Sequence, residues 1–274
     1  MEQSQLLAHC GSSKITREEL KVIPTPAGSA THQPLPHFEI VGALVETLSF
    51  RQISVVREEY AVTGDGMKMF GVLDLETTFD GCRFSIGVRN SNDKSMRLAL
   101  TVGYRVLVCD NMAFHGDYTP VLAKHTKHLS LVDILSVGVD RMQRNFEPMK
   151  KQVDAWKGTR LPDDTAKLVI YRAFVEGKLD APKHLARRVH DEYFNPRVEE
   201  FAPRTVWSLS NAFTSAFKDL DPIPQFKTTA KLASFLDLAT ASSNCSHQKC
   251  SIAVSRGRGG SLAAASQPHL GRGQ

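Results

Sequence analysis

The chain has 274 residues, of which 42% are hydrophobic and 23% charged, the composition of an ordinary globular protein that can bury a core. The formal net charge is +5, yet residues 241–274 carry four basic residues and no acidic one, which leaves only +1 for residues 1–240. Bulk charge therefore excludes a uniformly basic nucleic-acid-binding domain, and any such surface must come from local clusters of lysine and arginine.

The sequence gives no sign of a membrane segment. No apolar run approaches the roughly 20 residues that span a bilayer, and the first residues have neither the basic start nor the long apolar stretch of a secretion signal. We expect a cytoplasmic protein with no membrane partner. The cysteines are five, an odd number, and Cys82 and Cys109 lie in apolar strands, which predicts buried free thiols. A catalytic Cys109 beside His115 is the minor alternative.

Residues 1–36 are predicted to be an irregular, proline-rich leader. Within it, Thr16 followed by Glu19 is the pattern of a capped helical turn. Residues 37–50 place apolar side chains at three- and four-residue spacing behind Pro36, which predicts a helix.

Residues 51–112 are predicted to form an antiparallel meander of strands joined by short turns. Apolar and polar residues alternate along residues 82–89 and 98–104, and the polar run 90–95 between them indicates a hairpin turn. Two similar strands precede this hairpin, joined at Gly64-Asp65-Gly66. Consecutive strands with short turns favour an antiparallel sheet and an α+β fold.

Histidines follow the sheet, but their spacing does not indicate a metal site. His115, His125 and His128 stand with Asp117 in residues 115–129, and the long gap between the first two matches no helical ligand motif. A solvated loop with a basic edge is the favoured interpretation, so neither a metal nor another cofactor is expected.

Residues 130–160 give the strongest helical pattern. A continuous seam of apolar side chains alternates gaps of three and four, and Pro148 falls inside it, which predicts one bent helix. The seam residues are Val132, Leu135, Val139, Met142, Phe146, Met149, Val153 and Trp156. Packing on the chain's own sheet is the favoured use of this seam, and pairing with a second copy in a homo-oligomer is the alternative.

Further helices are predicted up to residue 240, from about 162–176, 182–193, 203–220 and 229–239. The predicted organisation is a single α+β domain over residues 37–240, with helices at 37–50 and 130–240. Residues 241–274 are rich in serine, glycine and alanine and are predicted to be a disordered basic tail. Cys245, His247 and Cys250 supply only three zinc ligands there, one short of a structural site.

Two motifs in the sheet resemble a known family. The run Val88–Ser95 reads Val-Arg-Asn-Ser-Asn-Asp-Lys-Ser, and residues 105–114 read Arg-Val-Leu-Val-Cys-Asp-Asn-Met-Ala-Phe. Together they are similar to the paired motifs of the domain of unknown function 932 family, whose members are described as phage/plasmid-related proteins. The resemblance extends over roughly residues 14–240 and includes 66–71 and 201–214. It assigns motif roles to Asn90, Ser91, Asp93, Ser95, Arg105, Cys109 and Asn111.

The favoured function is non-enzymatic binding of nucleic acid, with single-stranded DNA preferred, in phage/plasmid-type DNA metabolism. Residues 121–160 hold eight basic and four acidic residues, and strands followed by a long helix are similar in order to annealing proteins of the Rad-fifty-two and Red-beta type. The predicted polyanion-binding residues are Arg141, Arg144, Lys150, Lys151, Arg187 and Arg188.

Two other functions stay open from the sequence. A protein-binding structural or regulatory module of a mobile element would use the seam helix. An enzyme is the third choice, because Asp74, Glu76, Asp93, Asp110, Asp117 and His115 would have to surround one cleft, and no catalytic spacing accompanies them.

Overall fold

The computed structural model describes residues 12–255, with side chains for residues 13–221 and 224–241. It is an α+β fold built on a seven-stranded antiparallel sheet in the order β1-β2-β3-β4-β5-β6, with β7 also paired to β5. The strands are β1 (Ser12–Ile15), β2 (Val55–Thr63), β3 (Lys68–Phe79), β4 (Cys82–Ser91), β5 (Leu98–Val106), β6 (Met112–Phe114) and β7 (Val121–Ala123). The helices are α1 (Arg17–Leu20), α2 (His37–Phe50), α3 (Leu131–Gly158), α4 (Asp163–Phe174), α5 (Leu185–Phe194), α6 (Val206–Phe217) and α7 (Pro222–Ser255), with a short 3-10 turn at Glu199–Phe201.

The predicted meander is confirmed by β2, β3, β4 and β5, each antiparallel to the next. Gly66 and Gly81 make two of its turns with positive φ, which a residue without a Cβ adopts at little cost. The sheet is wider than predicted, because β1 joins from the leader and β6 and β7 follow residue 110. The leader is therefore not irregular throughout: Ser12–Ile15 pairs with β2, and the predicted capping box of Thr16 and Glu19 opens α1.

Strand β5 is buried along its whole length. On one side it pairs with β4, and its other edge is divided between β7, opposite Leu98–Leu100, and β6, opposite Gly103–Arg105. Between these two short strands, the N–H of Val102 donates to Tyr118 and its carbonyl accepts from the N–H of His115. Hydrogen bonds therefore continue along the edge through the gap between the two strands.

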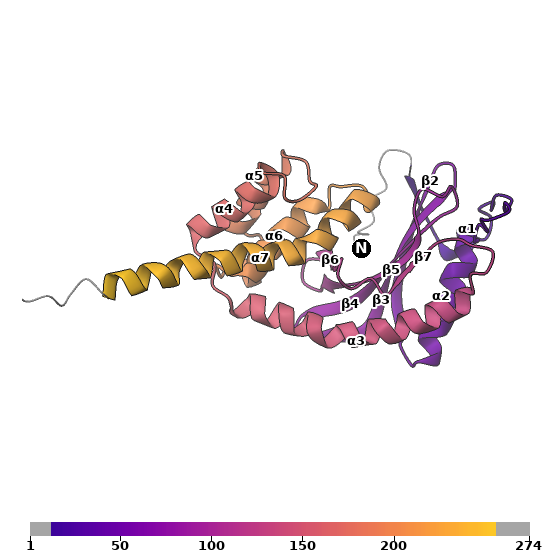
Figure 1. The fold of residues 1–274 in the computed structure, drawn as a ribbon, viewed down its shortest axis with the longest axis horizontal. Helices are drawn as coiled ribbons and strands as arrows, with labels where there is room; N and C mark the ends of the chain where they lie inside the picture. The colour runs from indigo at the N-terminus through magenta and orange to yellow at the C-terminus, as the bar shows by residue number, and fades with distance from the viewer. Residues whose placement is uncertain (1–11, 256–274) are drawn as a thin grey trace, which may run out of the picture.

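Helices α2 and α3 pack against each other and beneath the sheet (Figure 1). Helix α3 is one curved helix that continues through Pro148, as predicted. Its seam is buried against the chain's own core, where Phe146 stacks on Phe84 of β4 with ring centroids 4.1 Å apart. Val132 is the exception: it is 66% exposed, although Leu131 and Ile134 beside it pack against the core.

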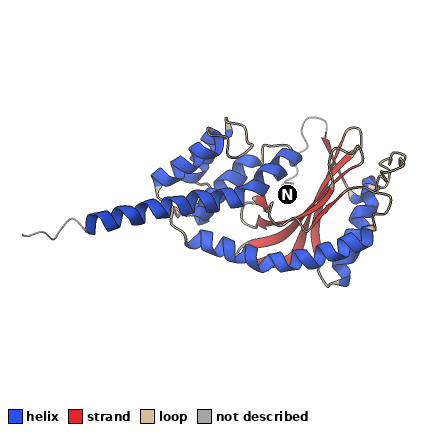
Figure 2. Cartoon of the chain, viewed as in Figure 1, coloured by secondary structure: helices blue, strands red, loops and turns tan. Residues whose placement is uncertain are grey.

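Helices α4 to α7 form a helical layer to one side of the sheet (Figure 2). Phe226 near the start of α7 packs with Phe70 and Phe114 in a second, smaller apolar cluster. Helix α7 runs from Pro222 to Ser255 and is therefore longer than the helix predicted over 229–239. Residues 241–255 are helical rather than irregular. Residues 241–255 contain no proline or glycine that would interrupt a helix. The side chains of Cys245, His247 and Cys250, and the rest of the predicted tail, lie outside the described residues. In the described part of the chain, no helix has the length and apolar character needed to cross a bilayer.

Candidate functional site

The turn between β4 and β5 is held together by Asp93. Its carboxylate accepts the Ser91 hydroxyl and the Ser95 N–H, the latter at 3.0 Å, and lies 3.3 Å from Lys68 Nζ. Burial alone would raise the pKa of Asp93, but these hydrogen bonds lower it well below its usual range. The turn is thereby fixed with Lys94 in the left-handed region at φ +66°, which a lysine seldom adopts.

A buried hydrogen-bond chain lies just before this turn, centred on Asn90. Its Nδ2 donates to the Leu35 carbonyl at 3.2 Å and lies 2.9 Å from His37 Nδ1. Its Oδ1 is 2.6 Å from His125 Nε2, and His37 Nε2 is 2.9 Å from the Gly66 carbonyl oxygen. Asn90 therefore connects α2, the sheet and the segment after β7 through side chains alone.

The direction of each hydrogen bond around Asn90 follows from the two backbone carbonyls at the ends of this hydrogen-bond chain, those of Gly66 and Leu35. The Gly66 carbonyl can only accept, so His37 carries its proton on Nε2 and accepts from Asn90 at Nδ1. The Leu35 carbonyl fixes the Asn90 amide with Nδ2 as donor, so Asn90 Oδ1 accepts from the Nε2–H of His125. The neutral His125 ring is left with an unprotonated Nδ1 that has no hydrogen-bond partner among the described residues.

Both histidines of this hydrogen-bond chain, His37 and His125, favour the neutral form. Burial lowers the pKa of His37, although the Gly66 carbonyl opposes the effect. Burial also lowers the pKa of His125, and the neighbouring His32 and His37 lower it further. The tautomers deduced above are therefore those expected at neutral pH.

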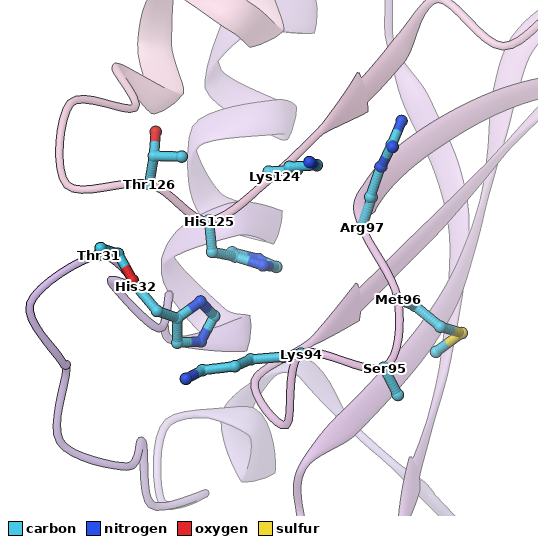
Figure 3. Close-up of a pocket in the computed structure, with 9 residues that line it drawn as sticks. All are labelled: Thr31, His32, Lys94, Ser95, Met96, Arg97, Lys124, His125 and Thr126. Carbon is cyan, nitrogen blue, oxygen red and sulfur yellow. The ribbon is translucent and has the colours of Figure 1, made fainter.

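His125 lines a pocket of about 390 Å³ (Figure 3). Three segments that are distant in sequence enclose it: the loop before α2, the β4–β5 turn and the stretch after β7. Figure 3 shows the His32 ring beside the Lys94 side chain, the His125 ring above them, and Lys124 extending toward Arg97. The lining residues are Thr31, His32, Lys94, Ser95, Met96, Arg97, Lys124, His125 and Thr126.

The pocket is basic. Lys94, Arg97 and Lys124 bring three cations to its wall, and no carboxylate lines it among the described residues. None of the three forms an ion pair in the described part of the chain. Positive charges gathered around a concave surface raise the local concentration of anions. The arrangement is therefore suited to bind an anionic group.

The second motif lies at the opposite end of the paired strands. Arg105 is buried, with Nε 2.7 Å from Asp74 Oδ2, and it also faces Glu59 at 3.7 Å and Asp110 at 3.8 Å. Ser85 donates to the other oxygen of Asp74 at 2.7 Å. This ionic cluster is enclosed and structural in character, because Arg105 and Asp74 are almost fully removed from solvent.

Asn111 and Cys109 also have structural surroundings. Asn111 Nδ2 donates to the backbone carbonyl of Asn211 at 3.1 Å and to its side-chain oxygen at 3.0 Å, which ties the start of β6 to α6. The Cys109 carbonyl accepts from Lys218 at 2.6 Å. Burial raises the pKa of the Cys109 thiol to about 11 and that of Cys82 to about 12, so neither is a thiolate at neutral pH.

The predicted polyanion-binding residues do not share one surface with each other. Arg141, Arg144, Lys150 and Lys151 are exposed on α3. Arg187 and Arg188 lie on α5 and face Asp191 and Asp219, respectively. Helices α3 and α5 are on opposite sides of the molecule, with α6 and α7 between them (Figure 1).

No family model, curated protein or solved structure matches this chain. The resemblance of its two motifs to a known family therefore stays a prediction, and the geometry carries the functional argument.

The acidic residues considered for an enzyme do not form one cleft. Asp74 and Asp110 belong to the Arg105 cluster, whereas Asp93 lies at the far end of the hairpin. The described residues also contain no group of three or more histidine, cysteine, aspartate or glutamate side chains that could hold a metal ion.

The residues that make the pocket were only partly visible in the sequence. The β4–β5 turn and a basic edge in residues 115–129 were expected, but as separate features. The prediction that residues 115–129 form a solvated loop is wrong for His115 and His125, which are buried. His32 and His37 carried no signal, because they lie in or beside the proline-rich leader and meet the turn only through folding. Asn90, at the end of the alternating strand and before the polar turn, was the one local sign of a buried polar partner.

Proposed function

We propose that the protein binds nucleic acid, preferably single-stranded, and catalyses no reaction on it. The observation that carries the proposal is the pocket itself: three cations without ion pairs and two imidazoles surround a space with no lining carboxylate in the described part of the chain. Its volume of about 390 Å³ falls within the range of small-ligand sites. One nucleotide unit of a strand is the ligand that we expect there.

Single-stranded nucleic acid suits this pocket better than a duplex. Proteins that bind single strands combine basic side chains along the backbone with rings on which unpaired bases stack. The partly exposed His32 ring lies at the pocket and offers such a surface, and it packs nearly perpendicular to the buried His125 ring, with centroids 5.5 Å apart. Bases in a duplex are paired and stacked, so they could not reach the His32 ring.

The exposed basic residues of α3 extend the proposal to a second contact. Arg144 and Lys151 are seven residues apart on the outer face of the helix, where they can reach phosphates without disturbing the buried seam. Acidic residues on the same helix weaken the field, although Asp140 is paired with Arg51 at 2.6 Å. We expect this helix to contribute less than the pocket. Under the family resemblance, the biological setting would be phage/plasmid-type DNA metabolism.

The protein-binding alternative loses its main support. It rested on the α3 seam, and seven of the eight seam residues pack into the chain's own core. A self-association through the same seam loses its support for the same reason.

The test is a fluorescence-anisotropy titration of labelled single- and double-stranded oligonucleotides at two salt concentrations. Arg97→Glu combined with Lys124→Glu should weaken binding strongly and lower the salt slope by about 1.4, at roughly 0.7 for each lost single-strand contact. Arg144→Glu with Lys151→Glu should have a smaller effect. The charge-matched control, Lys178→Glu with Lys183→Glu, changes exposed residues of the α4–α5 connection and should bind like the wild type. Absence of salt-dependent binding by the wild type would refute the proposal.

A further inference from the structure

We propose that the pocket recognises the phosphate monoester at the end of a nucleic-acid strand rather than the phosphodiesters within it, an inference that rests on the proposed function. Two features carry it. One is the unprotonated Nδ1 that the buried hydrogen-bond chain leaves on His125, and the other is the number of cations that surround it.

The first feature selects for a ligand that carries a proton. His125 is only 5% exposed, its Nε2 is committed to Asn90, and Nδ1 is the remaining polar atom of a side chain that lines the pocket. A lone pair there repels an anionic oxygen and attracts a hydrogen-bond donor. A phosphodiester has no proton to give at neutral pH. A phosphate monoester, with a second pKa of about 6, shares its proton with an imidazole at little cost.

The network also resists the alternative, in which His125 itself becomes protonated before a ligand binds. Its Nδ1 faces no carboxylate among the lining residues, and the charged groups around it are Lys94, Arg97 and Lys124. Two further imidazoles, His32 and His37, lie next to it. A positive charge on His125 is therefore disfavoured while the pocket is empty.

The second feature is the match of charge. A monoester near neutral pH carries about −1.5 to −2 charges in solution, whereas each internal phosphodiester carries one. When a monoester passes its proton to His125, the phosphate keeps its second negative charge and the ring gains a positive one. The three cations come from two separate segments that line one pocket, rather than from a single element along which they would follow successive phosphodiesters. Lys94 is held there in a left-handed conformation that favours glycine or asparagine, so the turn presents its ammonium group at the cost of backbone strain.

The experiment compares three oligonucleotides of one sequence, bearing a 5′-phosphate, a 3′-phosphate or no terminal phosphate, with the label at the other end or within the strand. The full chain is titrated by fluorescence anisotropy at moderate salt. We expect one terminal phosphate to tighten binding about tenfold, the size of one additional charge-assisted hydrogen bond. A nucleoside monophosphate and inorganic phosphate serve as competitors that distinguish a strand end from a free phosphate compound.

Two variants test the residues without removing the fold. In His125→Gln, the side-chain amide can still donate to Asn90, but the ring Nδ1 is lost, so the preference for the terminal phosphate should fall to about twofold or less. In Lys94→Gly, the left-handed turn position receives the residue that suits it while the cation is removed, and the same loss is expected. Circular dichroism and melting temperature check that both variants are folded.

Each result other than the expected one has a defined meaning. Equal binding of all three oligonucleotides with a steep salt slope would overturn the strand-end inference and leave the proposed function intact. Absence of binding to any of them would overturn both. A terminal-phosphate preference that survives His125→Gln would overturn the role of Nδ1. Competition by the mononucleotide as effective as that of the oligonucleotide would replace the strand end with a free nucleotide as the ligand.

Discussion

Replacing Asn90 with alanine should destabilise the fold more than the same change two residues later. Asn90 is fully buried and serves the Leu35 carbonyl, His37 and His125. The Leu35 carbonyl also accepts from Asn92 Nδ2 at 3.0 Å, so it keeps a partner in Asn90→Ala. His37 Nδ1 and His125 Nε2 do not. Two buried groups without partners, at about 2 kcal/mol each, predict a loss of roughly 4 kcal/mol.

Asn92→Ala is the matched control. Asn92 accepts from the Leu35 N–H at 3.0 Å and donates to the Leu35 carbonyl. The carbonyl would retain Asn90, so one group, the Leu35 N–H, loses its partner. The expected loss is about 2 kcal/mol, half that of Asn90→Ala.

The assay is urea unfolding at pH 7, with the midpoint and slope fitted for each variant, because an unchanged slope shows that stability alone was altered. A double-mutant cycle with His37→Leu adds a second check: removing both partners should cost less than the sum of the single losses. Equal losses in Asn90→Ala and Asn92→Ala, or full additivity in the cycle, would refute the hydrogen-bond chain as a stabilising unit.

Three further predictions concern other parts of the fold. Burial lowers the pKa of His115 from 6.5 to about 4, so the unfolded chain takes up a proton before the folded one does; stability is complete above pH 6.5 and falls by roughly 3 kcal/mol as the pH drops to 4. His115→Phe should remove this part of the acid sensitivity, measured by urea unfolding at pH 7 and 4.5, and an unchanged pH dependence would contradict the assignment. Arg105→Ala should cost about 3 kcal/mol in the same assay, because Asp74 stays buried without its cation; wild-type stability would show that the pair is dispensable. A chain ending at Thr240 should still unfold cooperatively by calorimetry, since the buried residues of α7 in the described part of the chain precede that position, and a broad melt would argue otherwise.

The sheet and the long helix were predictable because their patterns are local. Period-two alternation with short polar turns indicated β2 to β5, and the three-four seam indicated α3 despite Pro148. The bounds of α2 were also predicted, since Pro36 marks its start. Strands β1, β6 and β7 were missed because three or four residues are too short to show a period, and only their distant partners make them strands.

The candidate site was predictable only in its centre. The polar turn after Asn90 was singled out from the sequence, but as a motif and a hairpin signal. Its partners His37 and His125 are 53 residues before it and 35 residues after it, and no sequence spacing records such contacts. The basic residues chosen on α3 and α5 followed helical patterns, whereas the pocket takes its cations from loops, which have no periodicity to read.

The divided edge of β5 has a consequence for how this protein meets other chains. An open sheet usually risks adding a foreign strand, because unpaired N–H and carbonyl groups along an edge form a template for aggregation or domain swapping. Here β7, β6 and the Val102 contacts occupy that edge from Leu98 to Arg105. Two strands of three residues each are too short to offer a continuous template of their own. Fibril-like growth from this side of the sheet would first have to strip both short strands away from β5.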